Sequence, residues 1–341
     1  MNIDKKIATR ESYGKALVEL GKENENVVVF DADLSTATKT NLFAKVFSNR
    51  FFDMGIAEQN MMGTAAGMST CGKVPYVSTF AVFAAGRAYD QVRNSICYPN
   101  LNVKICATHA GVTVGEDGAT HQMLEDLSLM RTLPNMTVMC TSDDIQTKWA
   151  VKEIAKLNGP VYLRLCRLTT PVIYDENTQF EIGKANQIGD GTAATIFATG
   201  VTVAEAIKAQ EKLKENGINV RVVDMHTIKP IDEEMIVKCA EETDRLISVE
   251  DHNIIGGLGS AIAEVLTNKC PKKLERMGIN DTFGKSGKAE ELMKYYGIDC
   301  ESIVGKFIQN NWQEKNVLIK LKLSKEQRRR ILWGKIIKVL H

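Results

Sequence analysis

Two histidines lie within one glycine-rich segment of this 341-residue chain. The segment, Thr108 to Gln122, reads THAGVTVGEDGATHQ and holds His109, Asp117 and His121. Its glycines at 111, 115 and 118 would each destabilise a helix or strand interior, so they predict a tight path with positive φ angles or close backbone approach. An imidazole there can carry a proton at neutral pH or contact a sugar hydroxyl or phosphate. We interpret the segment as a ligand-binding loop; structural histidines, and an aspartate that caps its own turn, are the alternatives.

A glutamate is the next candidate for chemistry. Glu58, in GIAEQN, follows an apolar and aromatic run and precedes the small residues from Gly63 to Gly67. This order predicts a strand end that leads into a tightly packed helix, where a carboxylate would be partly desolvated. Burial raises the pKa of a carboxyl group, so Glu58 could exchange a proton with a heterocycle. The alternative is a helix-start glutamate that the helix dipole favours.

Two aromatic residues follow in STFAVFAAGRAYDQ. Phe80 and Phe83 are spaced three apart amid alanines, an interval that predicts one aromatic face of a helix. Core packing is the ordinary interpretation of such a pair. Small alanines at 81, 84 and 85 would nevertheless leave room beside the rings, so a flat ligand could stack on them.

The composition is that of an ordinary globular chain of about two domains, with 44% hydrophobic residues, 25% charged residues and a formal net charge of +1. The eight cysteines form no CxxC pair and no His/Cys ligand spacing, and no apolar run reaches spanning length. We therefore expect reduced thiols in a cytoplasmic protein with no membrane contact and no metal ligands of its own.

The charge is unevenly distributed. Residues 311 to 341 carry nine Lys and Arg against two Glu, which leaves the first 310 residues at about +1 − 7 = −6. A basic run of this kind can bind nucleic acid or an anionic surface. Because the tail is short and lacks a recognised motif, we interpret it as a solvated helix, with nucleic-acid binding as the alternative.

The order of elements predicts an α/β fold. Short β-branched runs alternate with helical stretches, as in βα units around a buried, mostly parallel sheet. The first series has strands at 27–30, 103–107, 137–140 and 161–165, with helices at 12–20 and 146–157. The second has strands at 194–198, 219–224 and 245–250, with helices at 201–216 and 260–267. We expect two α/β domains at 1–175 and 190–310, joined by a linker at 176–189 and followed by the tail at 311–341.

Two glycine signals are interpreted as structural. Gly257 to Ile262 follows a strand and opens a helix, but the third glycine of a dinucleotide fingerprint is missing, so close packing of the strand and helix explains it better. The run from Gly189 to Gly191 imitates a diphosphate and metal motif, yet it precedes its strand. A β-turn is the preferred interpretation there.

The quoted motifs resemble a known family. GIAEQN, the STF aromatic segment and above all THAGVTVGEDGATHQ resemble the pyrimidine-binding domain of transketolase, and the second domain resembles the transketolase C-terminal domain. The resemblance covers about residues 7 to 310. It implies two consecutive α/β domains and the transfer of a two-carbon ketol unit from a ketose phosphate to an aldose phosphate, within carbohydrate metabolism and the pentose phosphate pathway.

The resemblance also implies roles for particular residues. Glu58 resembles the glutamate that protonates the aminopyrimidine ring of thiamine diphosphate, Phe80 and Phe83 the aromatic residues that stack on that ring, and Asp33 in DADLS an aspartate near the cofactor. Arg10, His109 and Arg167 resemble residues that hold the sugar phosphate, and guanidinium forks suit that anion. Asp117 and His121 match contacts to the substrate hydroxyls. Glu58, His109 and His121 are therefore the candidate catalytic residues. The sequence departs from the pattern at Ala37, where many transketolases carry a phosphate-contacting serine.

The diphosphate-binding domain of the family is not recognisable in this sequence. The resemblance therefore implies a separate N-terminal transketolase subunit, an α2β2 heterotetramer, and a divalent cation (Mg²⁺ or Ca²⁺) held mainly by that partner. A deoxyxylulose-phosphate synthase half or a 2-oxoacid dehydrogenase beta subunit would share Glu58 but use pyruvate as donor. A non-catalytic regulatory subunit that retains the fold is the remaining alternative.

Overall fold

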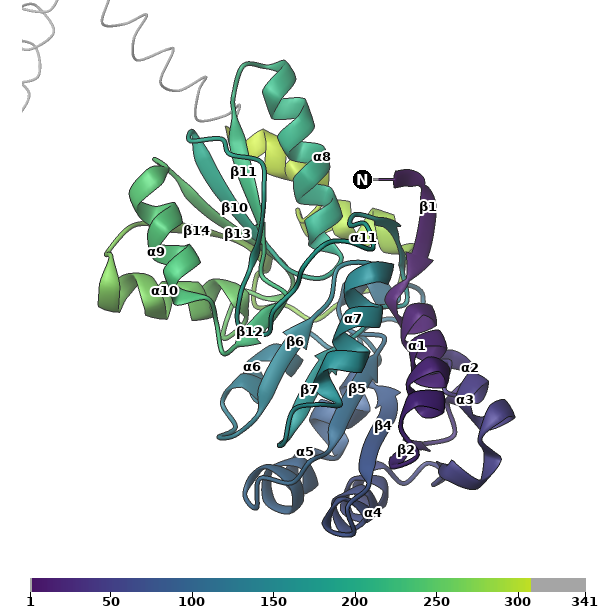
Figure 1. Cartoon of the computed structure of the whole chain (residues 1–341). Coiled ribbons are helices and arrows are strands. Elements are labelled where there is room, and N and C mark those ends of the chain that lie inside the picture. Colours follow the sequence, from purple (N-terminus) through teal and green to yellow (C-terminus); the bar gives the residue numbers. More distant parts are fainter. Residues whose placement is uncertain (1, 308–341) are drawn as a thin grey trace, which may run out of the picture.

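The computed structural model describes residues 2–307. The basic tail at 311–341 lies outside the described residues, and the expectations for it stay predictions. Two sheets, each covered by helices on both faces, account for most of the described chain (Figure 1).

The first sheet has seven strands in the order β12, β6, β7, β5, β4, β2, β3. Six of them run parallel, and β12 pairs antiparallel with β6. The strands are β2 (Val27–Asp31), β3 (Phe51–Asp53), β4 (Val74–Phe80), β5 (Lys104–Thr108), β6 (Thr137–Cys140), β7 (Val161–Arg164) and β12 (Thr227–Lys229). Because the strands are parallel, their carboxyl ends meet at one edge, where loops can present side chains to a ligand.

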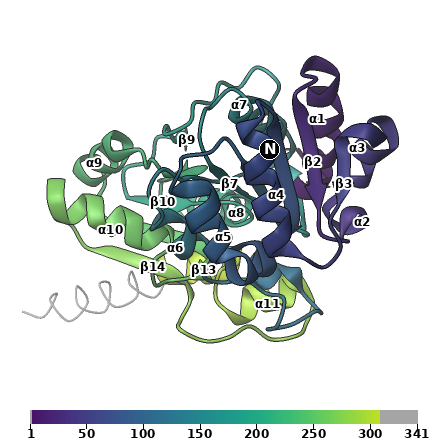
Figure 2. The same cartoon turned by 90° about the horizontal axis from the view of Figure 1, so that it is seen from below.

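Helices cover both faces of this sheet (Figures 1 and 2). Val27 and Val29 of β2 pack in the core that α1 (Thr9–Glu23) and α7 (Asp144–Ile154) share. The alternate residues Val28 and Phe30 pack in the core on the opposite face, which also includes residues of α4 and α6. This alternation follows from the two-residue period of a strand. The remaining helices of this part are α2 (Ser35–Thr38), α3 (Asn41–Val46), α4 (Glu58–Thr70), α5 (Tyr89–Gln91) and α6 (Asp126–Arg131).

The second sheet has five strands in the order β14, β13, β10, β11, β9. Four strands are parallel, and β9 pairs antiparallel with β11. They are β9 (Asn186–Ile188), β10 (Ala194–Ala198), β11 (Val220–Asp224), β13 (Leu246–Asn253) and β14 (Leu274–Ile279). Helices α9 (Glu233–Glu242) and α10 (Leu258–Lys269) pack on one face, and α8 (Thr202–Glu215) and α11 (Ala289–Tyr295) on the other.

The two sheets are closely connected. The hydrophobic core beneath α4 continues into the core beneath α9 and α10, so the two parts share buried apolar side chains. Strand β12 belongs to the first sheet although it follows β11 in the chain. A separate pair, β1 (Asn2–Ala8) with β8 (Thr169–Val172), brings the start of the chain next to residues that follow β7. Among residues 2–307, no helix is both long and apolar enough to cross a membrane.

The predicted α/β class with mostly parallel sheets is confirmed, and each strand and helix of the two predicted series overlaps an observed one. The helical interpretation of Phe80 was wrong, because Phe80 ends β4 and only Phe83 lies in the following π-helical turn at 82–87. Strand β4 was missed because Pro75 and the polar Ser78 and Thr79 interrupt its apolar pattern. Strand β9 lies within the stretch predicted as a linker and adds to the second sheet.

Candidate active site

The predicted site residues gather at the carboxyl edge of the first sheet. Phe80 is the last residue of β4 and pairs in register with Thr108, the last residue of β5, so His109 follows directly beside it. Arg167 lies three residues beyond the end of β7. Glu58 and Arg10 each lie in the first turn of a helix, α4 and α1 respectively. Residues that are distant in the sequence thereby share one edge.

Glu58 begins α4, as expected, and its side chain is 1% exposed. Its carboxylate accepts two hydrogen bonds from Nη1 of Arg87, at 2.9 and 3.0 Å. Arg87 itself is 47% exposed, so water solvates part of the guanidinium. A buried carboxylate needs such a partner because an unpaired buried charge is costly. Arg87 is a site residue that sequence reasoning missed; its place in GRAYDQ, 29 positions from Glu58, carries no local signal of the pairing.

The aromatic residues connect Glu58 to the histidine loop. Arg87 lies over the ring of Phe83, with 4.5 Å between its guanidinium carbon and the ring centroid. The rings of Phe83 and Phe80 are nearly parallel, with centroids 6.0 Å apart. The ring of Phe80 stacks in turn on the imidazole of His109 at 3.8 Å. The two phenylalanines therefore form a continuous aromatic surface even though they do not share a helix face.

His109 is buried in a strained conformation, with a φ of 57° that non-glycine residues seldom adopt. Its Nε2 lies 3.2 Å from Nη1 of Arg10, and its Nδ1 lies 2.8 Å from Oγ1 of Thr108. Because a guanidinium can only donate, Nε2 accepts and the ring proton is on Nδ1. Burial, followed by the positive charges of Arg10 and Arg167, lowers the pKa of His109 to about 3. Burial therefore favours the neutral imidazole, and of the two roles expected for His109, contact with a ligand is the one that fits.

We expect the His109 imidazole to stay neutral between pH 5 and 8. In the unfolded chain a histidine titrates near 6.5, so the stability that neutral His109 contributes is present above about pH 6.5 and is lost as the pH falls below it toward 3. NMR of the ring nitrogens should show a constant neutral tautomer over this range, with the His109→Asn variant identifying the signal. A titration midpoint near 6.5 would contradict the assignment.

Two arginines converge beside His109. Arg10 donates from Nη1 to the backbone oxygen of Ala37 at 2.9 Å, and its buried Nε has no protein partner among the described residues. Arg167 donates from Nη1 to the backbone oxygen of Val114 at 2.7 Å. Burial lowers the pKa of Arg10, and the nearby charge of Arg167 lowers it further. The two guanidinium groups carry positive charge close together and keep N–H donors that no acceptor within residues 2–307 uses. An anion such as a phosphate would bind favourably between them.

The rest of the glycine-rich loop has the predicted geometry, because Gly111, Gly115 and Gly118 all have positive φ angles. Asp117 is exposed, and its Oδ2 lies 3.7 Å from Nη1 of Arg167, which also approaches the carboxylate of Glu116 at 3.6 Å. His121 presents its ring edge to Phe83, with centroids 5.7 Å apart. The structure thus brings Asp117 and His121 to the same cluster as His109.

Asp33 is near this edge but shares no described contact with the cluster. It is exposed, has a φ of 60°, and its backbone amide donates to Oδ1 of Asp53 at 3.1 Å. The neighbouring Asp31, which was missed, is buried and accepts hydrogen bonds from the hydroxyls of Thr38 and Thr40 at 2.7 Å each. Burial raises the pKa of Asp31 to about 6. Asp31 thus fixes the segment that carries Asp33 and Ala37.

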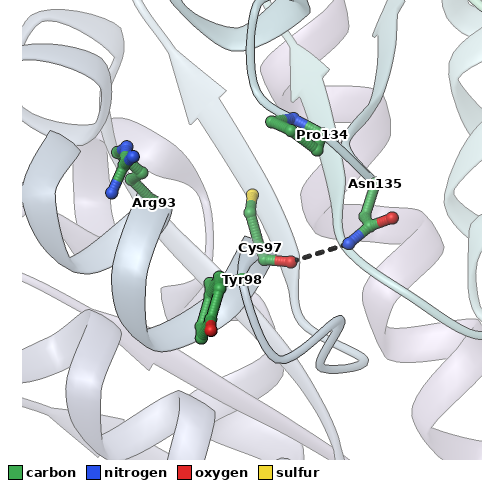
Figure 3. A pocket seen from close by; sticks show the side chains of 5 residues that line it. All are labelled: Arg93, Cys97, Tyr98, Pro134 and Asn135. Carbon is green, nitrogen blue, oxygen red and sulfur yellow. Dashed lines mark hydrogen bonds between the residues drawn. The ribbon is translucent and has the colours of Figure 1, made fainter.

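A hollow of about 120 Å³ has a different set of residues around it (Figure 3). Arg93, Cys97, Tyr98, Pro134 and Asn135 line it, and Asn135 donates to the backbone oxygen of Cys97 at 3.0 Å. Burial raises the pKa of the Cys97 thiol to about 12, so the thiolate that a nucleophile requires does not form near neutral pH. None of the predicted site residues lies there.

The two glycine signals have structural explanations. Leu258 and Gly259 donate their amides to the carboxylate of Glu250 at 2.7 and 2.9 Å, so this helix N-terminus already has an acidic partner. The Gly189 to Gly191 run connects β9 to β10 and packs against Gln210 and Asn219. Within residues 2–307, no group of three or more His, Cys, Asp or Glu side chains is arranged to hold a metal ion.

Two family models match the chain. The transketolase pyrimidine-binding domain matches residues 5–172, and the transketolase C-terminal domain matches residues 183–303. The first of these ranges contains every residue of the candidate site, and the second contains all five strands of the second sheet.

Individual relatives agree with the models. A protein of Methanocaldococcus jannaschii, provisionally named a transketolase C-terminal section, is 55% identical over 89% of this chain and 96% of its own length. A solved split-gene transketolase, described as an inactive β4 tetramer, is 53% identical with a TM-score of 0.82 over 88% of this chain and 96% of that chain. Human transketolase is 38% identical over 87% of this chain, which spans only 48% of that protein.

Proposed function

The chain belongs to the transketolase family, and from that premise we propose that it is the C-terminal subunit of a two-subunit transketolase. The proposed reaction transfers a two-carbon ketol unit from a ketose phosphate to an aldose phosphate. The observation that carries the proposal is the unbroken series of contacts from Glu58 through Arg87, Phe83 and Phe80 to His109. A carboxylate that can exchange a proton, a flat aromatic surface and an anion-binding loop therefore lie close enough together to contact one bound cofactor and one bound substrate.

The cofactor in this proposal is thiamine diphosphate, which supplies the carbon nucleophile when bound. The residues fit its pyrimidine ring: Glu58 is a buried carboxylate able to hold a proton shared with a ring nitrogen, and the partly exposed Phe83 offers an aromatic face beside it. The exposed side chain of Arg87 can withdraw from Glu58 into water when the ring takes its place. Asp33 is proposed to lie near the cofactor as well.

The sugar phosphate is proposed to bind where Arg10 and Arg167 converge. Both guanidinium groups can donate two parallel hydrogen bonds to a phosphate, and its negative charge would relieve their mutual repulsion. Arg10 already contacts the backbone oxygen of Ala37, so the segment that lacks the usual serine is still adjacent to this site. Neutral His109 accepts a hydrogen bond from Arg10 through Nε2 and so lies beside the phosphate without adding a third positive charge.

His121 and Asp117 are proposed to contact the sugar hydroxyls near the bond that breaks. His121 lies against Phe83, next to the proposed pyrimidine site, and can take or give a proton at that position. Asp117 is accessible and lies beside Arg167, so a sugar held by its phosphate would reach it. The loop thus orients the substrate relative to the cofactor.

A separate N-terminal subunit is proposed to complete the site, in an α2β2 assembly. The chain spans about half of human transketolase, and the described residues contain no candidate group for the divalent cation that accompanies the diphosphate. The partner would therefore hold the diphosphate together with Mg²⁺ or Ca²⁺. We place the pair in cytoplasmic sugar-phosphate metabolism, in keeping with eight cysteines that form no disulfide.

The donor distinguishes this proposal from its nearest alternatives. With the N-terminal transketolase section of the same organism present, the chain should transfer two carbons from a ketose phosphate such as xylulose 5-phosphate and show no thiamine-dependent turnover of pyruvate. The reverse preference would instead support a deoxyxylulose-phosphate synthase or a 2-oxoacid dehydrogenase. A stable complex that turns over neither donor would support the non-catalytic subunit.

A further inference from the structure

Asp251 of the second domain binds a loop that belongs to the first. It lies on β13 and is 2% exposed, yet its carboxylate accepts hydrogen bonds from residues 139 and 138 positions earlier in the chain. Its Oδ1 accepts from the amide of Val112 at 2.8 Å, and its Oδ2 accepts from the amide and hydroxyl of Thr113 at 3.3 and 2.7 Å. All of these donors lie in the loop shortly after His109.

The position of Gly111 shows how closely the loop backbone packs against the carboxylate of Asp251. Its φ is 80°, and a Cβ atom at this position would collide with the carboxylate of Asp251. The backbone therefore turns directly against the carboxylate just after His109, which is itself held at an unfavourable φ of 57°. Strained residues persist only where their surroundings fix them. The contacts of Asp251 supply part of that restraint.

Further hydrogen bonds hold the main chain of Asp251 and the far end of the loop. Arg164, which is buried, donates to the backbone oxygen of Asp251 at 2.9 Å and forms a bidentate ion pair with Asp126 at 2.7 and 3.1 Å. Gln122, at the end of the loop, donates from Nε2 to the backbone oxygen of Lys285 in the second domain at 2.9 Å. The same Nε2 approaches the oxygen of Gly115 at 3.1 Å. The loop is thus attached to the second domain at both ends.

We propose that Asp251 is a positioning residue for the two-carbon transfer, through which the second domain sets the loop that carries His109, Asp117 and His121. Asp251 does not touch the substrate in this account. It holds the amides of Val112 and Thr113, so that the imidazole of His109 stays stacked on Phe80 and beside Arg10. The activity part of the proposal rests on the function proposed above.

The test compares Asp251→Asn with the neighbouring Glu250→Gln. Both changes replace a buried carboxylate by an amide on the same strand, but Glu250 binds the start of α10 and has no hydrogen bond to the loop. The amide group that replaces the Asp251 carboxylate has one oxygen and one nitrogen, and its nitrogen can only donate. At least one of the loop donors therefore loses its acceptor. Thr113→Val removes only the hydroxyl bond from the loop side and gives a milder second variant.

Hydrogen exchange in the full chain provides a readout that needs no activity. We expect at least one of the amides of Val112 and Thr113 to exchange about tenfold faster or more in Asp251→Asn, since a lost hydrogen bond of about 1.4 kcal/mol is a factor of ten. Glu250→Gln should leave both amides unchanged. Equal exchange in the two variants would overturn the proposal, whatever the enzyme assay shows.

Kinetics with the partner subunit provide the second readout. Asp251→Asn should raise KM for the ketose phosphate about tenfold or more, because a displaced loop no longer holds His109, Asp117 and His121 where they contact the substrate. The apparent affinity for thiamine diphosphate should stay within about twofold. Thr113→Val should show a smaller change in the same direction. A parallel loss of cofactor affinity, or an unchanged KM, would assign Asp251 a purely structural role. An inactive wild-type pair would count against the proposed function, while the exchange data would still decide the loop contact.

Discussion

Replacing Glu58 by glutamine should lower the rate of two-carbon transfer by about 10²- to 10⁴-fold in the reconstituted pair, the range typical for loss of a positioned acid or base. Glutamine preserves the size of the side chain and can still form hydrogen bonds. It cannot take up and release the proton that the pyrimidine nitrogen requires. Because the buried Glu58 carboxylate accepts both hydrogen bonds from Arg87, the change removes one of these acceptors together with the exchangeable proton.

The matched control is Glu250→Gln, which alters a second buried glutamate that lies outside the site. Burial raises the pKa of Glu250 to about 7, and its carboxylate accepts hydrogen bonds from the amides of Leu258 and Gly259. This variant should retain activity within about threefold of wild type, because Glu250 contacts the start of α10 and none of the candidate site residues. Steady-state rates for both variants, with circular dichroism to confirm folding, would complete the comparison. Retained activity in Glu58→Gln would remove Glu58 from the mechanism.

Removing either arginine should weaken the binding of phosphorylated donors specifically. Arg10→Ala and Arg167→Ala are each expected to raise KM for a ketose phosphate about 10- to 100-fold, since a hydrogen bond to a charged group contributes about 1.5–3 kcal/mol. An unphosphorylated ketose lacks the anion, so its KM should change much less. The diagnostic result is therefore the difference between the two changes in KM, one for the phosphorylated donor and one for the unphosphorylated donor.

Two further variants sharpen this test. Arg167→Lys retains the positive charge but loses the planar fork, and it should fall between wild type and Arg167→Ala. Arg93→Ala removes an exposed arginine in the hollow of Figure 3 and should leave KM unchanged for both donors. Equal effects of Arg10→Ala and Arg167→Ala on phosphorylated and unphosphorylated donors would contradict the proposed phosphate site.

Local patterns in the sequence predicted the parts of the fold that local chemistry determines. The β-branched runs became strands, Glu58 became the first residue of α4, and Gly111, Gly115 and Gly118 adopted positive φ angles. Each of these depends on residues within a few positions. The resemblance to transketolases supplied the candidate roles, and the structure shows that most of the named side chains share one edge of the sheet.

The missed features depend on residues that are distant in the chain. Arg87 pairs with Glu58 across 29 positions, and Asp251 binds Val112 across 139, so no periodic pattern links the partners. The pKa of His109 could not be inferred from its type alone, because it depends on burial and on two arginines that arrive from α1 and from beyond β7. The spacing of three between Phe80 and Phe83 suggested a helix only because strand β4, which ends at Phe80, was not recognised.

The most direct test of the proposed function is a two-carbon transfer assay on the purified chain alone, on the N-terminal transketolase section alone, and on the two together, each with thiamine diphosphate, Mg²⁺, a ketose phosphate and an aldose phosphate. The account predicts no transfer by either chain alone and transfer that saturates near equal amounts of the two. Thiamine-diphosphate-dependent transfer by this chain alone would contradict the two-subunit site.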